Sequence, residues 1–210
     1  GPLKRQLESL EALPKVLVVV MDLIAHGKLV KAEELCKGFM QKVPRHIEGM
    51  RLLADIGNRL GVLEDAEFLL ESAIEFSPDS TQVRIDYIHV LRKRQKYEEA
   101  LAQAKLLLAK DPKNPQFQSV FAIESMQSGD YDTALETFDS ILEIIPEDPV
   151  TLTSRGTALK TTGQTDEAID SYRRAIKKYQ GHGEAYYSLA NLKLFSFSEE
   201  EIATMEAQEG

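Results

Sequence analysis

Apolar residues along this chain recur at intervals of three and four, the spacing that places them on one face of an α-helix. The segments 131–142 and 165–176 show the pattern most clearly, with charged residues on the opposite face. No region has the composition of a series of strands. The hydrophobic pattern therefore predicts an all-α protein.

Three features of the sequence recur with a period of 34 residues, without insertion or deletion. An alanine recurs at Ala32, Ala66, Ala100, Ala134 and Ala168. Five residues earlier stand Gly27, Gly61, Gln95, Gly129 and Gly163, and twelve residues later stand Pro44, Pro78, Pro112, Pro146 and Gln180. The constant spacing predicts five repeats, each a pair of helices.

Each recurring residue type has a physical reason within such a pair. The glycine ends the first helix because it adopts the left-handed backbone conformation readily. The alanine lies where the two helices touch, and its small side chain allows close approach. The proline ends the second helix, since it lacks an N–H and clashes with a continuing helix. The dipeptides Asn114-Pro115 and Asp148-Pro149 are typical of the start of a new first helix.

The period and residue types resemble the tetratricopeptide repeat (TPR) family over nearly the whole chain. The resemblance implies a right-handed superhelical solenoid of antiparallel helix pairs. We place the repeats at residues 13–46, 47–80, 81–114, 115–148 and 149–182.

The two ends of the chain depart from the repeat pattern. Residues 1–12 are expected to hold a tag scar, Gly1-Pro2, followed by an N-terminal capping helix. Residues 183–210 are expected to form a sixth half-repeat, which begins at Gly183, and a C-terminal capping helix that starts near Ser198.

Composition narrows the classes of function. The chain has 25 Lys and Arg against 34 Asp and Glu, a net charge of −9, which argues against nucleic-acid binding. The longest apolar run, residues 16–21, is followed by Asp22 and is shorter than the ~20 residues of a membrane span. A single cysteine, Cys36, together with no recognisable signal peptide, favours a cytoplasmic location. We expect Cys36 to be a buried structural thiol, and we expect no metal and no cofactor, since the four histidines lack ligand spacing.

A narrower resemblance rests on the segments 50–57, 158–163, 183–193 and 195–202. They resemble the N-terminal TPR region of bacterial TPR-containing sulfotransferases, in which a PAPS-dependent catalytic domain follows the repeats. The chain itself has no glycine-rich phosphate loop, so we expect no catalytic residue and no enzyme activity within it. The resemblance implies a region that recruits a protein substrate or assembles a larger enzyme. A free-standing TPR adaptor is the alternative.

In TPR proteins, residues 2, 5, 9, 12 and 13 of each repeat tend to face the concave groove. The resemblance therefore implies that a peptide or protein segment binds there. The predicted partner-binding residues are Arg51, Asp55, Asn58, Arg59, His89, Arg92, Lys93, Gln116, Ser119 and Lys160.

The basic residues among them allow two interpretations. Arg51, Arg59, Arg92 and Lys93 can form a local basic patch whose guanidinium groups grip an acidic peptide. Alternatively, they form a solvated face whose charges pair with neighbours such as Asp55, which is the commoner outcome for charges on helices. Asp55 also argues against the carboxylate clamp of chaperone-binding TPRs, because it would repel a peptide carboxylate.

Two further positions leave alternatives open. Arg84 stands where a bulky inward residue is usual, and we expect it to extend to solvent or to pair with Asp86 or Glu48.

In the first repeat the groove positions are apolar, and they include Leu17, Met21 and Ile24. Either the N-terminal helix folds over them, or they form a homodimer surface.

Overall fold

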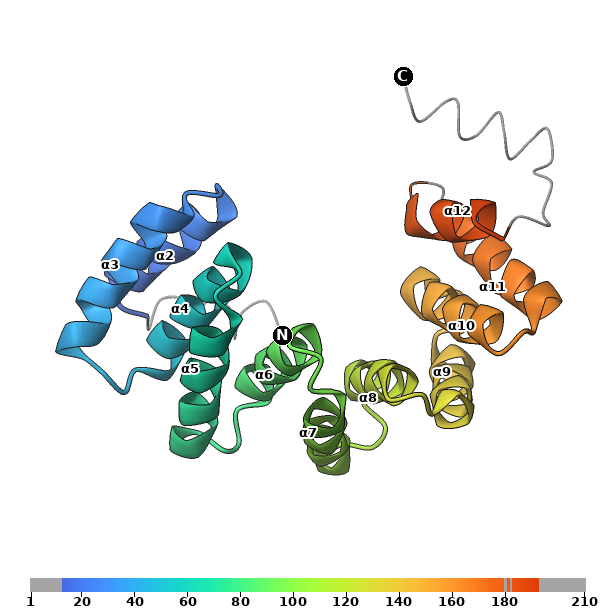
Figure 1. Cartoon of the computed structure of the whole chain (residues 1–210), viewed down its shortest axis with the longest axis horizontal. Helices are drawn as coiled ribbons and strands as arrows, with labels where there is room; N and C mark the ends of the chain where they lie inside the picture. Colours follow the sequence, from blue (N-terminus) through green and yellow to red (C-terminus); the bar gives the residue numbers. More distant parts are fainter. Residues whose placement is uncertain (1–12, 180, 182, 193–210) are drawn as a thin grey trace, which may run out of the picture. The chain divides into compact units, whose positions relative to one another are not determined.

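The computed structural model describes residues 13–179, 181 and 183–192. These residues form eleven α-helices and no strand, so the prediction of an all-α fold is confirmed (Figure 1). The predicted capping helix within residues 1–12 and the one near Ser198 lie outside the described residues. Among the described residues, no helix combines the length and apolar character that a membrane crossing requires.

Successive helices alternate as first and second members of a pair. The first helices are α2 (Lys15–Ala25), α4 (Ile47–Leu60), α6 (Thr81–Lys93), α8 (Pro115–Gln127) and α10 (Pro149–Thr161). The second helices are α3 (Leu29–Lys42), α5 (Leu63–Phe76), α7 (Tyr97–Lys110), α9 (Tyr131–Ile144) and α11 (Thr165–Lys178). A further first helix, α12 (Gly183–Ala190), begins at the glycine where the sequence predicts it.

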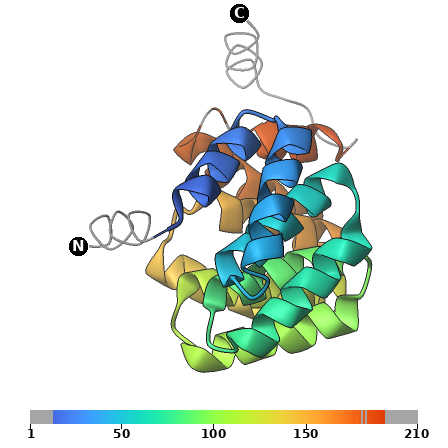
Figure 2. The ribbon, with the colours of Figure 1, turned by 90° about the vertical axis from the view of Figure 1, so that its left-hand side faces the viewer.

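The chain divides into two compact units after Gln103, inside α7. In the first unit, α2 packs on α3 and α4 packs on α5, as the two views of its ribbon show (Figures 1 and 2). In the second unit, α8 packs on α9 and α10 packs on α11. The uniform 34-residue period gave no sign of a division within the third repeat.

The turn inside each pair has one backbone geometry. The predicted turn glycines have φ between 69° and 87°, and Gln95 takes the same left-handed conformation with φ of 61°. The backbone N–H of Lys96 donates to the Leu91 carbonyl at 2.9 Å, and the N–H of Val62 donates to the Gly57 carbonyl at 2.8 Å in the equivalent turn. Gln95 therefore takes the turn geometry of the repeat although its Cβ makes that conformation costly.

The predicted caps of the first helices are also confirmed. The side chain of Asn114 accepts a hydrogen bond from the backbone N–H of Gln116 at 3.0 Å, and that of Asp148 accepts one from Thr151 at 2.8 Å. Each cap satisfies a backbone donor that the helix itself leaves without an acceptor.

The five recurring alanines are fully buried, as close contact between the helices of a pair requires. Cys36 is fully buried as well, and its Sγ donates a weak hydrogen bond to the Gly49 carbonyl at 3.4 Å. Burial raises the pKa of this thiol to about 11. Cys36 is therefore the inert structural residue that the sequence predicts.

In four of the five repeats, residues sixteen positions apart on the two helices pack in one core, and their sizes are complementary. A small residue on the first helix goes with a large one on the second in Ala54 with Leu70, Ala122 with Phe138 and Gly156 with Tyr172. In the first repeat the order is reversed, with Val20 on the first helix and the smaller Cys36 on the second. At the pair of Gly156 and Tyr172, a Cβ on residue 156 would lie 2.6 Å from Cε1 of the Tyr172 ring.

This contact predicts opposite effects for two helical glycines. Gly38→Ala, where a Cβ meets nothing within 4 Å, should raise the free energy of unfolding by about 0.5–1 kcal/mol. Gly156→Ala gains the same helix propensity but must displace the Tyr172 ring, so it should lower that free energy by about 1 kcal/mol or more. Urea unfolding followed by circular dichroism measures both, and equal effects of the two substitutions would contradict the contact.

Candidate functional site

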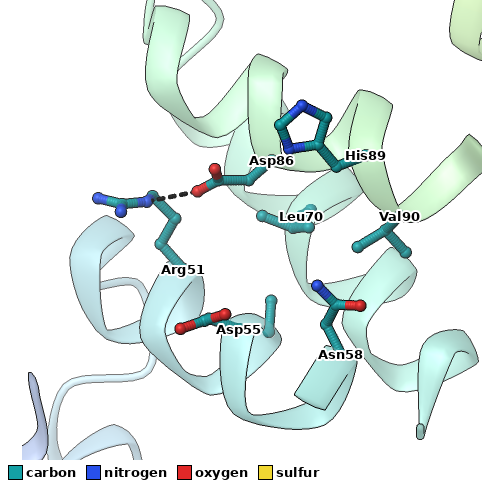
Figure 3. A pocket seen from close by; sticks show the side chains of 8 residues that line it. Arg51, Asp55, Asn58, Leu70, Asp86, His89 and Val90 are labelled. Atoms are coloured by element: carbon teal, nitrogen blue, oxygen red, sulfur yellow. Dashed lines mark hydrogen bonds and ion pairs between the residues drawn. The ribbon is translucent and has the colours of Figure 1, made fainter. Parts of the chain in front are cut away.

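A cavity of about 230 Å³ lies in the first unit, among α4, α5 and α6 (Figure 3). The residues that line it are Arg51, Ala54, Asp55 and Asn58 of α4, Leu70 of α5, and Asp86, His89 and Val90 of α6. The floor consists of the apolar side chains of Ala54, Leu70 and Val90, each no more than 2% exposed. Polar and charged side chains surround this floor.

Helical spacing explains why these side chains meet. The four α4 residues follow one another at intervals of three, one and three, so they share one face of the helix. Asp86, His89 and Val90 follow one another at intervals of three and one, so they share one face of α6. Leu70 reaches the cavity from α5 because its partner across the pair, Ala54, is short. The cavity therefore draws on two consecutive repeats.

Arg51 is held by carboxylates of its own chain. Its Nε donates to Oδ2 of Asp86 at 2.6 Å, and its Nη1 donates to the two carboxylate oxygens of Glu48 at 3.0 and 2.7 Å. Gln82 donates to the other oxygen of Asp86 at 2.9 Å. Burial lowers the pKa of Arg51, but Asp86 and Glu48 outweigh it, so the pKa is raised. A ligand carboxylate would have to compete with both internal carboxylates for Arg51.

The other predicted groove cations also have neighbours. Arg59 donates from Nε to both carboxylate oxygens of Asp55, at 3.0 and 3.1 Å. Lys93 donates from Nζ to the side-chain oxygen of Asn58 at 2.7 Å. The interpretation in which groove charges pair locally is therefore what the structure shows for Arg51 and Arg59.

His89 lies half-buried at the edge of the cavity. Burial lowers the pKa of its imidazole, and the nearby cations Arg92 and Lys93 lower it further, while Asp86 acts in the opposite direction. The net effect is a lowered pKa, so the ring is neutral near pH 7.

Three predicted partner-binding residues lie in the second unit and do not line this cavity. Gln116 and Ser119 are on α8, and Lys160 is on α10. Gln116 and Lys160 are exposed, and Ser119 is half-buried.

The apolar groove positions of the first repeat are mostly interior. Leu17 is fully buried and Ile24 is 6% exposed, in a core cluster with Leu52 and Ile56 of α4. Met21 is half-buried and packs against the same cluster. The exposed apolar residues of α2 are instead Val18 at 42% and Val19 at 49%.

The sequence did not predict which residue forms an ion pair with Asp86. We expected Arg84 to extend to solvent or to pair with Asp86 or Glu48, but both carboxylates pair with Arg51. Arg84 is 7% exposed and donates to the side chain of Gln103 and, at 3.0 Å, to the carbonyl of Pro78. This expectation was therefore wrong.

The sequence separation of the paired residues nevertheless indicates the contacts between repeats. Arg51 and Asp86 are 35 residues apart, as are Asn58 and Lys93. That separation is one 34-residue repeat plus one residue. Each pair therefore joins a groove position of one repeat to the position one residue further along in the next repeat. The apolar floor had no such signal, because its residues do not occupy the predicted groove positions.

Comparison with known families agrees with this fold. A family model described as the cytochrome c-type biogenesis protein H TPR domain matches residues 37–151, and a second, described as a tetratricopeptide repeat, matches residues 153–192. The first covers more than half of the chain, which therefore belongs to this family of tetratricopeptide repeat domains.

Relatives of known name match only parts of the chain. Small glutamine-rich tetratricopeptide repeat-containing protein 2 of Mycosarcoma maydis is 33% identical over 87 residues, which cover 41% of this chain and 24% of that protein. DnaJ homolog subfamily C member 3 of Homo sapiens is 26% identical over 155 residues, 67% of this chain and 31% of that protein. The chain thus spans less than a third of the length of either relative.

Solved structures show the same fold at low identity. A tetratricopeptide repeat protein from Parabacteroides merdae aligns with a TM-score of 0.73 and 22% identity, over 86% of this chain and 72% of that one. YrrB, described as a TPR protein with an unusual peptide-binding site, aligns with a TM-score of 0.64 and 15% identity, over 89% and 96%. None of these four relatives is named as a sulfotransferase.

The surroundings of His89 predict a pH dependence of stability. The unfolded chain takes up a proton near pH 6.5, whereas the folded imidazole, which faces Arg92, Lys93 and Asp86 on α6 and Arg51 and Asp55 on α4, resists it. The free energy of unfolding should therefore fall as the pH drops below 6.5, and His89→Gln should remove that part of the decrease. An NMR titration of the His89 ring should give a midpoint below 6.5, and a midpoint above 6.5 would contradict this environment.

Proposed function

We propose that the chain is a protein–protein interaction scaffold whose first unit binds an extended segment of another protein at the α4–α6 cavity. The observation that carries the proposal is the cavity itself, which brings together four predicted groove residues from two consecutive repeats, Arg51, Asp55, Asn58 and His89. TPR domains are non-catalytic binding domains, and the related fold of YrrB is described as having a peptide-binding site.

The size of the cavity favours part of a protein chain over a small molecule. Small-molecule and cofactor sites commonly enclose about 300–1,000 Å³. A volume of about 230 Å³ is below that range and suits a single side chain of a longer ligand. The rest of such a ligand would lie along the exposed face of α4 and α6.

The charges around the cavity favour a ligand segment that is not acidic. The guanidinium groups of Arg51 and Arg59 are already paired with carboxylates. An acidic peptide would have to displace these internal partners, so the basic-patch hypothesis loses its main support. Specificity would come from shape and hydrogen bonding more than from net charge.

Substitutions in the cavity should weaken binding of a peptide selected on this chain from a display library of short random sequences. Asn58→Ala should raise the Kd about three- to tenfold, the effect of removing one hydrogen bond. Gln116→Ala and Lys160→Ala, at predicted groove positions of the second unit, serve as controls and should leave the Kd unchanged. Isothermal titration calorimetry measures all three, and an effect of the two controls without an effect of Asn58→Ala would contradict the proposed site.

Self-association through the first repeat is the alternative function. Because Leu17 and Ile24 are buried, such a dimer would use Val18 and Val19 of α2. Sedimentation velocity separates the alternatives: a dimer that Val18→Asp abolishes would favour self-association over peptide binding.

A role next to a sulfotransferase domain is a separate proposal, carried by the sequence resemblance of residues 158–163 and 183–193. In such a protein, the peptide-binding unit would recruit the protein substrate. A full-length gene product that carries a glycine-rich phosphate loop after these repeats would support this arrangement, and one without it would refute it.

A further inference from the structure

We propose that the α4–α6 cavity receives one uncharged apolar side chain, and that Asn58, oriented by Lys93, donates a hydrogen bond to a main-chain carbonyl of the same segment. This inference rests on the proposed function and names the chemistry of its ligand. It differs from the sequence-based hypothesis in which the basic residues of the groove bind an acidic peptide.

The floor of the cavity is the first reason. Ala54, Leu70 and Val90 come from three different helices, and together they offer only methyl and methylene groups. Figure 3 shows Leu70 at the back of the cavity, with Val90 beside it. An aliphatic or aromatic side chain gains free energy by leaving water for such a surface, whereas a polar one must give up its hydration.

The ion pairs are the second reason. Asp86 and Glu48 hold Arg51, and Arg59 holds Asp55, so each of these charges already has a partner of opposite sign. None of the charged residues that line the cavity offers such a group a free counter-ion, so a charged ligand group over the apolar floor would have to break one of these pairs. Burial of such a charge without a partner is unfavourable for either sign. The same cavity therefore discriminates against both acidic and basic side chains.

The orientation of the Asn58 amide is the third reason. Lys93 has only donors, and its Nζ contacts Oδ1 of Asn58 at 2.7 Å, so the oxygen of the amide is engaged. The amide nitrogen then presents its two N–H groups on the other side, and Figure 3 shows it turned toward Leu70 and His89. Main-chain carbonyls are the acceptors that every peptide carries next to its side chains. Lys93 is thus a positioning residue that fixes which end of Asn58 faces the ligand.

His89 completes the set of groups available to the ligand. Its lowered pKa keeps the ring neutral near pH 7, so it offers one donor and one acceptor without adding charge. A neutral His89 and the neutral Asn58 amide beside an apolar floor match an uncharged side chain with its flanking peptide groups.

The test uses peptides selected on the intact chain from a display library of short random sequences. Methyl and side-chain amide NMR signals of Ala54, Leu70, Val90 and Asn58 locate each selected peptide. We expect the selected peptides to share one apolar residue whose replacement by Ala weakens binding about tenfold, and whose replacement by Glu or Lys weakens it further. Shifts of the Asn58 amide signal should accompany binding.

Three variants test the positioning role of Lys93. Lys93→Met should weaken the best selected peptide several-fold and change the Asn58 amide signal, whereas Lys93→Arg, which still donates to Asn58, should restore both. Lys31→Met removes an exposed lysine of α3 that lies outside the cavity and outside the predicted groove positions, and it should have no effect. Equal binding by Lys93→Met and the native chain would overturn the role of Lys93.

The outcomes separate this inference from the proposed function. Peptides that bind at α4 and α6 but prefer a charged residue at the cavity, or tolerate any residue there, would overturn the inference and leave the scaffold function standing. Peptides that bind only outside α4–α6, or a library that yields no binder, would contradict the proposed function itself.

Discussion

The contact between the two helices of each repeat is the constraint on which the rest of the structure depends. Two packed helices leave a limited space between them, and four of the five repeats fill it with residues sixteen positions apart and of complementary size. Gly156 lies against the Tyr172 ring, and Ala122 shares a core cluster with Phe138. Successive helix pairs then bury the remaining apolar surface by stacking on one another.

The cavity of the first unit follows from the same constraint. In the second repeat, the small residue on the first helix is Ala54, and its partner Leu70 extends far enough to form part of the groove floor. Two links between repeats then complete the rim, one from Arg51 to Asp86 and one from Lys93 to Asn58. The residues that stabilise the packing are thus also the residues that shape the proposed binding surface.

The sequence predicted the fold more fully than the site, for physical reasons. Helix pairs, turns and caps depend on short-range chemistry, and even Gln95 takes the left-handed turn that its position in the repeat requires. The site depends on side chains from different repeats and on their ion pairs. Position in the repeat located Arg51 and Asn58 at the cavity, but it could not show that Arg51 is held by Glu48 and Asp86. It also left out the apolar floor, which only packing reveals.

The most direct test of the central claim, that the hollow beside Leu70 is the binding surface, is the peptide affinity of a Leu70→Phe variant. Phe opposite Ala is already accommodated at Ala122 and Phe138, so the variant should fold with little change in unfolding midpoint. Leu70→Met, which conserves volume, is the matched control. We expect Leu70→Phe to abolish binding of a selected peptide and Leu70→Met to retain it. Undiminished binding by a stably folded Leu70→Phe variant would contradict the claim.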